Sequence, residues 1–424
     1  MLTRGEFLCG ALSASFHNLS AAALAQPAAP GPQAELRSLD VPFDHRRPQE
    51  GRFALDYFVA RPFDRGKPTI LVVADGQQFY VRRDVWAAWQ SRFGEGVNVV
   101  GVPGRGAAHG LQQRLGLPSG DGWVEAYRLL RYEQWVADID LIRRALAGPR
   151  GRVGLYGASG GGRLVHEYLS RYGAGAERAL TQAAVFTYLD AEFGLRSDRF
   201  WEEIAPADRT TLAGLLAQHP ERREELAKLF QRQNFFVPPQ EIAAARHRLI
   251  GDLAAGHDDV VARLRTEYQI DAIDRLEATP LGAAIRVRLY EFYAPVADRM
   301  PPPGEAFLPD LEVSAATARP LLELYRAGRI PAPAIDLAAL HRVQAEVLMV
   351  AGRYDHTADY RSQIALASCY PNHRLLLLDD NHNFARLAAS GLGPRINAAW
   401  RAGFASPAFT ELTSDLRALL WQES

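Results

Sequence analysis

Apolar and polar positions follow two alternating patterns along most of the chain. Short apolar runs, each of which predicts a buried strand, stand at 67–76, 96–106, 152–159, 179–187, 345–355 and 373–384. Residues 52–62 alternate apolar and polar side chains, which predicts an antiparallel strand. Apolar residues recur at helical spacing in 132–148, 162–173, 360–370 and 409–421. Strands that alternate with helices in this way predict an α/β fold with a mostly parallel sheet and helices on both faces.

The strand pattern stops between about 190 and 340. Helical patterns separated by Pro and Gly fill this stretch, at 208–233, 238–256 and 280–296. The segments on either side share one α/β character. We therefore expect a core domain, 36–189 and 341–424, that is interrupted after its sixth strand by a helical cap, 190–340.

The N-terminal segment predicts export. Residues 1–25 have a basic start at Arg4, then a mostly small and apolar stretch, and a small-x-small site that ends at Ala25. These features predict a signal peptide, a Pro- and Ala-rich linker at 26–35, and a periplasmic or secreted protein. The alternative is a cytosolic protein with a disordered Ala-rich tail.

Composition narrows the expected partners. The 424 residues are 48% hydrophobic, enough for a large core, and the formal net charge is −1. That charge gives no electrostatic attraction to nucleic acid or to an anionic membrane, so we expect neither as a partner. No stretch after the N-terminal segment is apolar for 18 residues, so the mature chain is expected to lack a membrane span. Of the two cysteines, Cys9 leaves with the signal, so Cys369 stands alone and no disulfide framework is expected.

The sequence Gly157-Ala158-Ser159-Gly160-Gly161 is the strongest chemical signal. It matches G-x-S-x-G between a predicted strand and a predicted helix. A serine on such a sharp turn needs tiny neighbours, and the N–H groups at the helix start favour a developing oxyanion. Ser159 is therefore a candidate nucleophile, against the alternative of a structural glycine turn.

A nucleophilic serine needs a base and an acid that orients the base. In this sheet topology the chain order is Ser, acid, His, and catalytic groups lie beyond the carboxyl ends of the strands. His382 follows the last predicted strand and Asp355 follows the one before it, so these two are the candidate base and acid. Asp359 is the alternative acid, whereas Asp379 and Asp380 are interpreted as strand-end residues.

An oxyanion hole is expected from two backbone N–H groups. One is that of Gly160, and the other is that of Gln77 or its neighbour Gln78, in the loop after the strand at 67–76. The glycine-rich segment 101–110 has the wrong spacing for dinucleotide binding, and no histidine cluster has metal-ligand spacing. We therefore expect neither a cofactor nor a metal.

These motifs together resemble the α/β-hydrolase superfamily. Within it, the chain is most similar to the proline iminopeptidase and tripeptidyl aminopeptidase group of serine peptidases. The likeness rests on "GLYGASGGG" around Ser159, "VLMVAGRYD" ending at Asp355 and "LLLLDDNHNF" around His382, and on the long helical insertion. The chain departs from the group in its oxyanion loop, at Gly160, where an aromatic residue often stands, and at Asn381, where a glycine usually stands.

The resemblance implies an exported serine hydrolase that cleaves an amide or ester through an acyl-enzyme, most like an aminopeptidase. The cap is expected to form a lid over Ser159. In the resembled aminopeptidases, cap carboxylates hold the free amino terminus of the substrate, which implies this role for Glu291; the alternative is a solvated residue paired with Arg286 or Arg288. A carboxylesterase of the same fold and a catalytically silent binding protein are the alternative functions.

Overall fold

The computed structural model describes residues 34–75, 81, 86–195, 200–297 and 307–421. The predicted signal peptide, 1–25, lies outside these ranges, as do residues 26–33 of the predicted linker and the predicted oxyanion donor Gln77. Within the described ranges, no helix is both long enough and apolar enough to cross a membrane.

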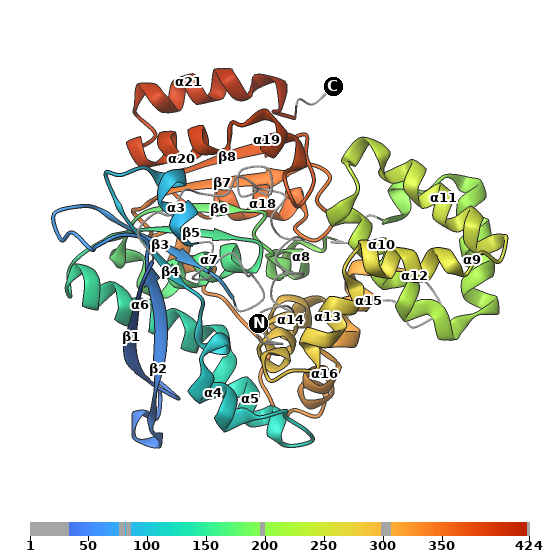
Figure 1. The fold of residues 1–424 in the computed structure, drawn as a ribbon, viewed down its shortest axis with the longest axis horizontal. Helices are drawn as coiled ribbons and strands as arrows, with labels where there is room; N and C mark the ends of the chain where they lie inside the picture. The colour runs from blue at the N-terminus through green and yellow to red at the C-terminus, as the bar shows by residue number, and fades with distance from the viewer. Residues whose placement is uncertain (1–33, 76–80, 82–85, 196–199, 298–306, 422–424) are drawn as a thin grey trace, which may run out of the picture.

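The described residues form a single eight-stranded sheet in the order β1-β2-β4-β3-β5-β6-β7-β8 (Figure 1). The strands are β1 Glu35–Pro42, β2 Arg52–Val59, β3 Thr69–Val73, β4 Asn98–Val102, β5 Val153–Ala158, β6 Ala176–Gln182, β7 Glu346–Gly352 and β8 His373–Leu378. β2 pairs antiparallel with both β1 and β4, and all other neighbours are parallel. This is the strand order of the α/β-hydrolase fold, so the predicted fold class is confirmed.

The burial of each strand follows from its neighbours. All residues of β3 and β4 are buried, because parallel strands are covered by helices on both faces. β2 alternates exposed and buried residues, as its sequence pattern predicts. β1 was not predicted as a strand. It begins at Glu35, the last residue of the predicted linker, and half of its residues are polar, as expected for the outer strand of the sheet.

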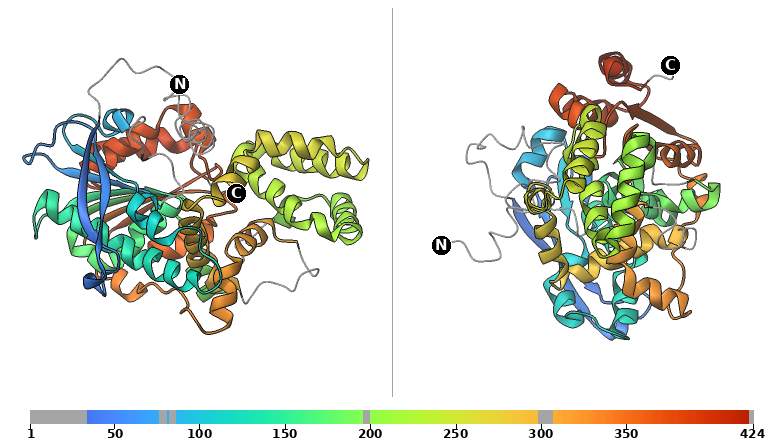
Figure 2. Two further views of the ribbon diagram at one scale, coloured as in Figure 1. Left: turned by 60° about the horizontal axis from the view of Figure 1, so that its bottom comes forward. Right: turned by 90° about the vertical axis from the view of Figure 1, so that its right-hand side faces the viewer.

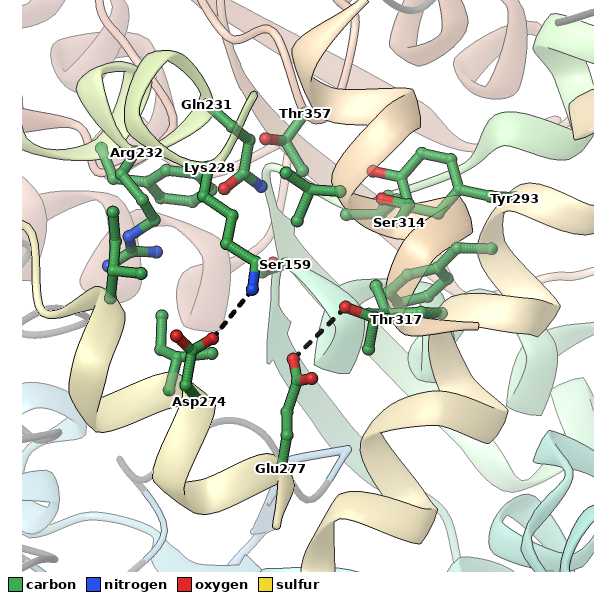
Figure 3. A pocket seen from close by; sticks show the side chains of 17 residues that line it. Ser159, Lys228, Gln231, Arg232, Asp274, Glu277, Tyr293, Ser314, Thr317 and Thr357 are labelled. Carbon is green, nitrogen blue, oxygen red and sulfur yellow. Dashed lines mark hydrogen bonds and ion pairs between the residues drawn. The ribbon is translucent and has the colours of Figure 1, made fainter. Parts of the chain in front are cut away.

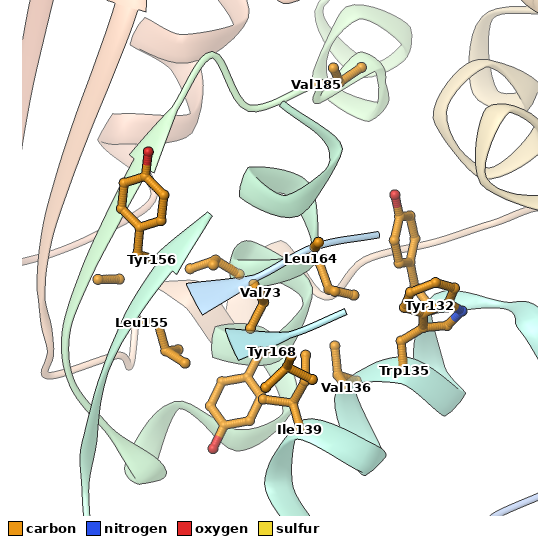
Figure 4. Packing of buried hydrophobic residues seen from close by; sticks show 14 of the residues in the cluster. Val73, Tyr132, Trp135, Val136, Ile139, Leu155, Tyr156, Leu164, Tyr168 and Val185 are labelled. Atoms are coloured by element: carbon orange, nitrogen blue, oxygen red, sulfur yellow. The ribbon is translucent and has the colours of Figure 1, made fainter. Parts of the chain in front are cut away.

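Helices cover both faces of the sheet. On one face, Trp135 and Ile139 of α6 (Tyr132–Ala147) and Leu164 of α7 (Gly160–Tyr172) belong to the same buried cluster as Leu155 of β5 (Figure 4). On the other face, the next residue of β5, Tyr156, packs against aromatic rings of α3 (Trp86–Phe93). The remaining core helices are α4 His109–Leu115, α5 Gly122–Leu130, α18 Tyr360–Ser368, α19 Ala385–Ser390, α20 Gly393–Ala402 and α21 Pro407–Asp415.

The helical insertion lies between β6 and β7, where the sequence predicts it. Its helices are α8 Thr187–Phe193, α9 Pro206–Gln218, α10 Arg223–Phe236, α11 Ile242–Ala254, α12 Asp259–Glu267, α13 Ile270–Glu277, α14 Leu281–Ala297, α15 Pro309–Thr317, α16 Arg319–Arg326 and α17 Leu337–Leu340. The helices α9 to α12 stand out to one side of the molecule in Figure 1 and in the left view of Figure 2.

The insertion packs as two units, because its apolar side chains belong to two separate hydrophobic clusters. Apolar side chains of α9 to α12 form a hydrophobic cluster of their own, which includes Leu212, Phe230 and Ile250. Residues of α14 and α16, such as Val287 and Leu321, belong instead to the large cluster that contains the strands of the sheet. The predicted cap, 190–340, thus contains an outer unit and an inner unit that is continuous with the main core.

Candidate active site

Ser159 stands at the turn between β5 and α7. Its backbone has φ 53° and ψ −123°, a conformation that residues other than glycine rarely adopt. The turn is fixed by hydrogen bonds on both sides: the N–H of Ser159 donates to Gln182 O at 2.8 Å, and its carbonyl accepts from Arg163 N at 3.1 Å. The strained serine is therefore held at the carboxyl edge of the sheet.

Glycines around Ser159 are required by the closeness of the surrounding atoms. A Cβ on Gly157 would overlap the backbone of Gly161, and a Cβ on Gly160 would overlap the Asp75 carboxylate. A Cβ on Gly162 would press against Ala184. These contacts explain why the motif needs glycine at each of these three positions.

The structure brings together the three side chains that the sequence singles out. His382 Nε2 lies 3.1 Å from Ser159 Oγ, and His382 Nδ1 lies 2.8 Å from Asp355 Oδ2. Asp355 follows β7 and His382 follows β8, so the order of the strands sets the order of the three groups. Gly352 allows this approach, because a Cβ there would meet the carbonyl oxygens of Asp380 and Asn381.

Asp355 is oriented by its own loop. Its Oδ1 accepts hydrogen bonds from the N–H groups of Thr357 at 2.9 Å and Ala358 at 2.8 Å, which leaves Oδ2 to face the imidazole. Asp355 is 1% exposed and His382 is 3% exposed. A buried carboxylate in this position fixes the imidazole with a proton on Nδ1 and leaves Nε2 able to accept a proton from the serine.

The other carboxylates near the triad have structural roles. Asp359, the alternative acid, caps α18 by accepting from Arg361 N at 2.8 Å and pairs with the Arg361 guanidinium at 2.7 Å. Asp379 forms an ion pair with Arg386. Asp380 accepts from backbone N–H groups at the start of α19, and burial raises the pKa of its carboxyl. The geometry therefore favours Asp355 over Asp359 as the partner of His382.

The outer unit of the insertion contacts the histidine directly. The Phe235 ring of α10 meets the His382 ring edge-to-face, with 4.9 Å between centroids. Asn383 donates a hydrogen bond to Phe235 O at 2.6 Å, and Asn381 donates to Val237 O at 3.4 Å. The loop that carries the candidate base is thus tied on both sides of His382 to the end of α10.

The expected oxyanion hole is described only in part. Gly160 begins α7, where its N–H is among those that the helix leaves unpaired. Asp75, which follows β3, lies beside Gly160 and is buried, and its Oδ2 pairs with Arg288 Nε of α14 at 2.9 Å. This ion pair, which sequence reasoning missed, balances a negative charge that would otherwise oppose an oxyanion.

A pocket opens in front of Ser159 (Figure 3). Much of its lining is apolar and comes from both units of the insertion: Phe235, Ile270, Ile273, Leu289, Phe292, Tyr293 and Val313. Four charged side chains also line it. Lys228 of α10 pairs with Asp274 of α13 at 3.0 Å, while no ion pair between described residues that line the pocket involves Arg232 or Glu277. Besides its apolar wall and the Lys228–Asp274 pair, the pocket therefore has two charged groups of opposite sign that do not pair with each other, Arg232 and Glu277.

Glu291 is not among the residues that line this pocket. Its side chain turns to the inner face of α14, where Oε2 accepts a hydrogen bond from Tyr132 N at 2.7 Å. There it lines a different, polar cavity, together with Arg131, Arg163 and Glu167. Burial raises the pKa of Glu291 to about 8. The sequence-based role of Glu291 in substrate binding does not fit this position, and neither does its alternative as a solvated surface residue, because Glu291 is buried.

The raised pKa of Glu291 predicts a dependence of stability on pH. Because the folded protein holds this proton up to about pH 8, whereas a free glutamic acid releases it near 4.5, the free energy of unfolding should fall as pH rises between these values. The slope is at most about 1.4 kcal/mol per pH unit. The glutamine of Glu291→Gln has no proton to lose, so this decrease is absent in the variant. In urea unfolding, the free energy of unfolding of the variant relative to that of the parent should therefore increase from pH 5 to pH 8. A difference that stays constant over this range would contradict the prediction.

Glu277, which sequence reasoning missed, is the second carboxylate of the pocket, and neither of the two described cations that line the pocket forms an ion pair with it. It stands at the end of α13, and Thr317 Oγ1 donates to it at 3.4 Å. Arg286 Nη2 lies 3.7 Å away, and burial raises the pKa of the Glu277 carboxyl. The available signal was the spacing in "IDAIDRLE", which places Asp274 and Glu277 on neighbouring positions of one helix face.

Among known proteins, the chain is similar to solved structures at low identity. No family model matches the sequence, and no curated protein matches it. Among solved structures, a proline iminopeptidase from Mycobacterium smegmatis has a TM-score of 0.47 and 16% identity, over 90% of this chain and 100% of that one. An acetylester hydrolase from Corynebacterium glutamicum has a TM-score of 0.43 and 16% identity, over 88% and 96%. With TM-scores below 0.5, neither likeness assigns an activity to this chain.

Proposed function

We propose that this protein is a serine hydrolase that cleaves an ester or amide through an acyl-enzyme. The observation that carries the proposal is the position of His382, whose two nitrogens lie within hydrogen-bond reach of Ser159 and Asp355. A complete nucleophile, base and orienting acid at the mouth of an apolar pocket is more than binding alone requires.

The proposed reaction follows from this geometry. Ser159 Oγ attacks the carbonyl carbon while His382 Nε2 takes the serine proton. Asp355 stabilises the imidazolium that forms, and the N–H of Gly160 donates to the tetrahedral oxyanion, with a second donor proposed at Gln77. His382 then gives the proton to the leaving group, and it activates a water that releases the acyl group from the serine.

Covalent labelling tests this proposal without knowledge of the substrate. A fluorophosphonate reacts only with a serine that has both a working base and an oxyanion hole. We expect stoichiometric labelling of Ser159, identified by peptide mass spectrometry, and none in Ser159→Ala. A folded parent protein that stays unlabelled would favour the alternative of a silent binding protein.

We further propose that the substrate has a free amino group. Glu277 binds this group, a role that was expected of Glu291 from the sequence. Glu277 faces the same pocket as Ser159, and its ion pair with Arg286 is long, at 3.7 Å. Asp274 is held more closely, by Lys228 at 3.0 Å and by Arg265 at 2.7 Å. An ammonium group would supply this half-buried carboxylate with a charge-assisted hydrogen bond. This arrangement supports the aminopeptidase over the carboxylesterase.

A matched pair of substrates tests the amine proposal. An amino-acid naphthylamide with a free α-amine should have kcat/KM about tenfold or more above that of its acetylated form, because a hydrogen bond to a charged group is lost on acetylation. Glu277→Gln should remove this preference, while Glu291→Gln should keep it. Equal hydrolysis of both compounds, or hydrolysis of simple esters only, would assign the protein to the esterases.

The proposed location is outside the cytoplasm. The support is the N-terminal sequence, with its basic start and small-x-small site at Ala25. Sequencing the N-terminus of the natively expressed protein from each cell fraction tests it. A cytoplasmic protein that retains residues 1–25 would overturn the proposal.

A further inference from the structure

Arg232 is the cation of the Ser159 pocket for which the described residues provide no ion pair. It lies on α10, is 5% exposed, and donates from Nε to Tyr268 O at 3.1 Å. Within the described part of the chain, its Nη2 has no hydrogen-bond partner and no carboxylate forms an ion pair with it. Burial removes the hydrogen bonds that this guanidinium makes to water, and the protein replaces only some of them, which costs free energy. The Arg232 guanidinium is therefore a candidate for binding a ligand.

The guanidinium is held rigidly in this position. Its central carbon lies 4.9 Å from the ring centroids of both Phe235 and Phe236. Burial lowers the pKa of Arg232 to about 10, so the group is still positively charged at neutral pH. A fixed cation with an unused donor is already organised to receive an anion.

Arg232 is also close to the catalytic groups. The Phe235 ring that stacks on its guanidinium is the ring that meets His382, and both separations are 4.9 Å. The guanidinium carbon is therefore at most twice that distance from the imidazole centre. Figure 3 shows the guanidinium turned toward the space between α10 and α13, which is the space that Ser159 faces.

The neighbouring cation of the pocket is compensated. Lys228, one helical turn before Arg232, pairs with Asp274 at 3.0 Å. Asp310, whose negative charge is near Arg232, accepts hydrogen bonds from Asn234 at 3.0 Å and Thr357 at 2.9 Å. The positive charge that the pocket offers to a ligand is thus that of Arg232.

We propose, resting on the serine hydrolase function above, that the substrate carries a carboxylate that binds Arg232. The Nη2 group donates to this carboxylate while the reacting carbonyl lies at Ser159. A small zwitterion with both ends free, such as a dipeptide, satisfies Arg232 and Glu277 at once. The site therefore selects short substrates whose negative end lies near the scissile bond.

The experiment measures how small ligands slow the fluorophosphonate labelling of Ser159. Hexanoate and hexanamide have the same chain and differ in charge. At the hexanoate concentration that slows labelling of the parent about tenfold, hexanamide should slow it less than about twofold, because the amide loses the charge-assisted hydrogen bond. In Arg232→Gln, hexanoate should likewise slow labelling less than about twofold, since its affinity falls by about tenfold or more.

Two further variants complete the design. Arg248→Gln removes a positive charge from an exposed position of α11, so hexanoate should slow the labelling of this variant as much as that of the parent. Arg232→Lys keeps the positive charge but loses the planar set of guanidinium donors. Hexanoate should therefore slow its labelling less than that of the parent and more than that of Arg232→Gln. Equal protection by hexanoate and hexanamide in the parent would overturn the inference, as would full protection that persists in a folded Arg232→Gln. A parent that is not labelled at all would instead overturn the proposed function.

Discussion

Ser159→Ala should lower kcat by about 10⁶-fold, to a residual rate that the oxyanion hole and binding alone sustain. The reason is that the variant lacks the only oxygen that lies 3.1 Å from His382 Nε2 among the described residues. Stability should be almost unchanged, because alanine is as small as serine and takes the same strained backbone at φ 53°.

Steady-state kinetics on the best naphthylamide or ester measures this effect. Thermal unfolding of parent and variant is the control, since a large drop in the unfolding temperature would mean that the turn itself was disturbed. Turnover that stays within tenfold of the parent would place the nucleophile elsewhere.

Asp355→Asn should lower kcat by about 10⁴-fold, although the side chain keeps its size. The amide oxygen is held by the N–H groups of Thr357 and Ala358, so the amide nitrogen is turned toward His382. A donor in that position leaves His382 Nδ1 as an acceptor and moves its proton to Nε2, where the imidazole cannot accept the serine proton.

The matched control is Asp359→Asn, which changes a neighbouring carboxylate that caps α18. It should reduce stability without a comparable loss of kcat. If instead Asp359→Asn lost activity and Asp355→Asn kept it, the assignment of the acid would be reversed.

The sheet and the position of the three candidate residues were within reach of the sequence for a physical reason. Parallel strands buried on both faces give continuous apolar runs, and these runs are easy to find. Once their order is known, Ser159, Asp355 and His382 must lie near one another, because each follows the carboxyl end of a strand in one sheet. β1 escaped the prediction since an outer strand with polar residues has no such run.

The insertion was harder to read, because its helices are buried on more than one side. In α14, Leu289, Phe292 and Tyr293 face the Ser159 pocket, while Tyr290 and Glu291 face the core. Both faces are apolar, so the sequence pattern alone does not show which one meets the substrate. Arg232 was missed for a related reason: its isolation depends on which side chains surround it after folding.

The bonds between the end of α10 and the loop of His382 mean that the outer unit is not an exchangeable module. The Phe235 ring packs against the candidate base, His382, and the carbonyls of Phe235 and Val237 hold the loop that carries it. A graft that replaced α9 to α12 by helices from another hydrolase, in the hope of changing specificity, would also remove the support of the base. Engineering of this protein should therefore change the pocket side of α13 and leave the end of α10 in place.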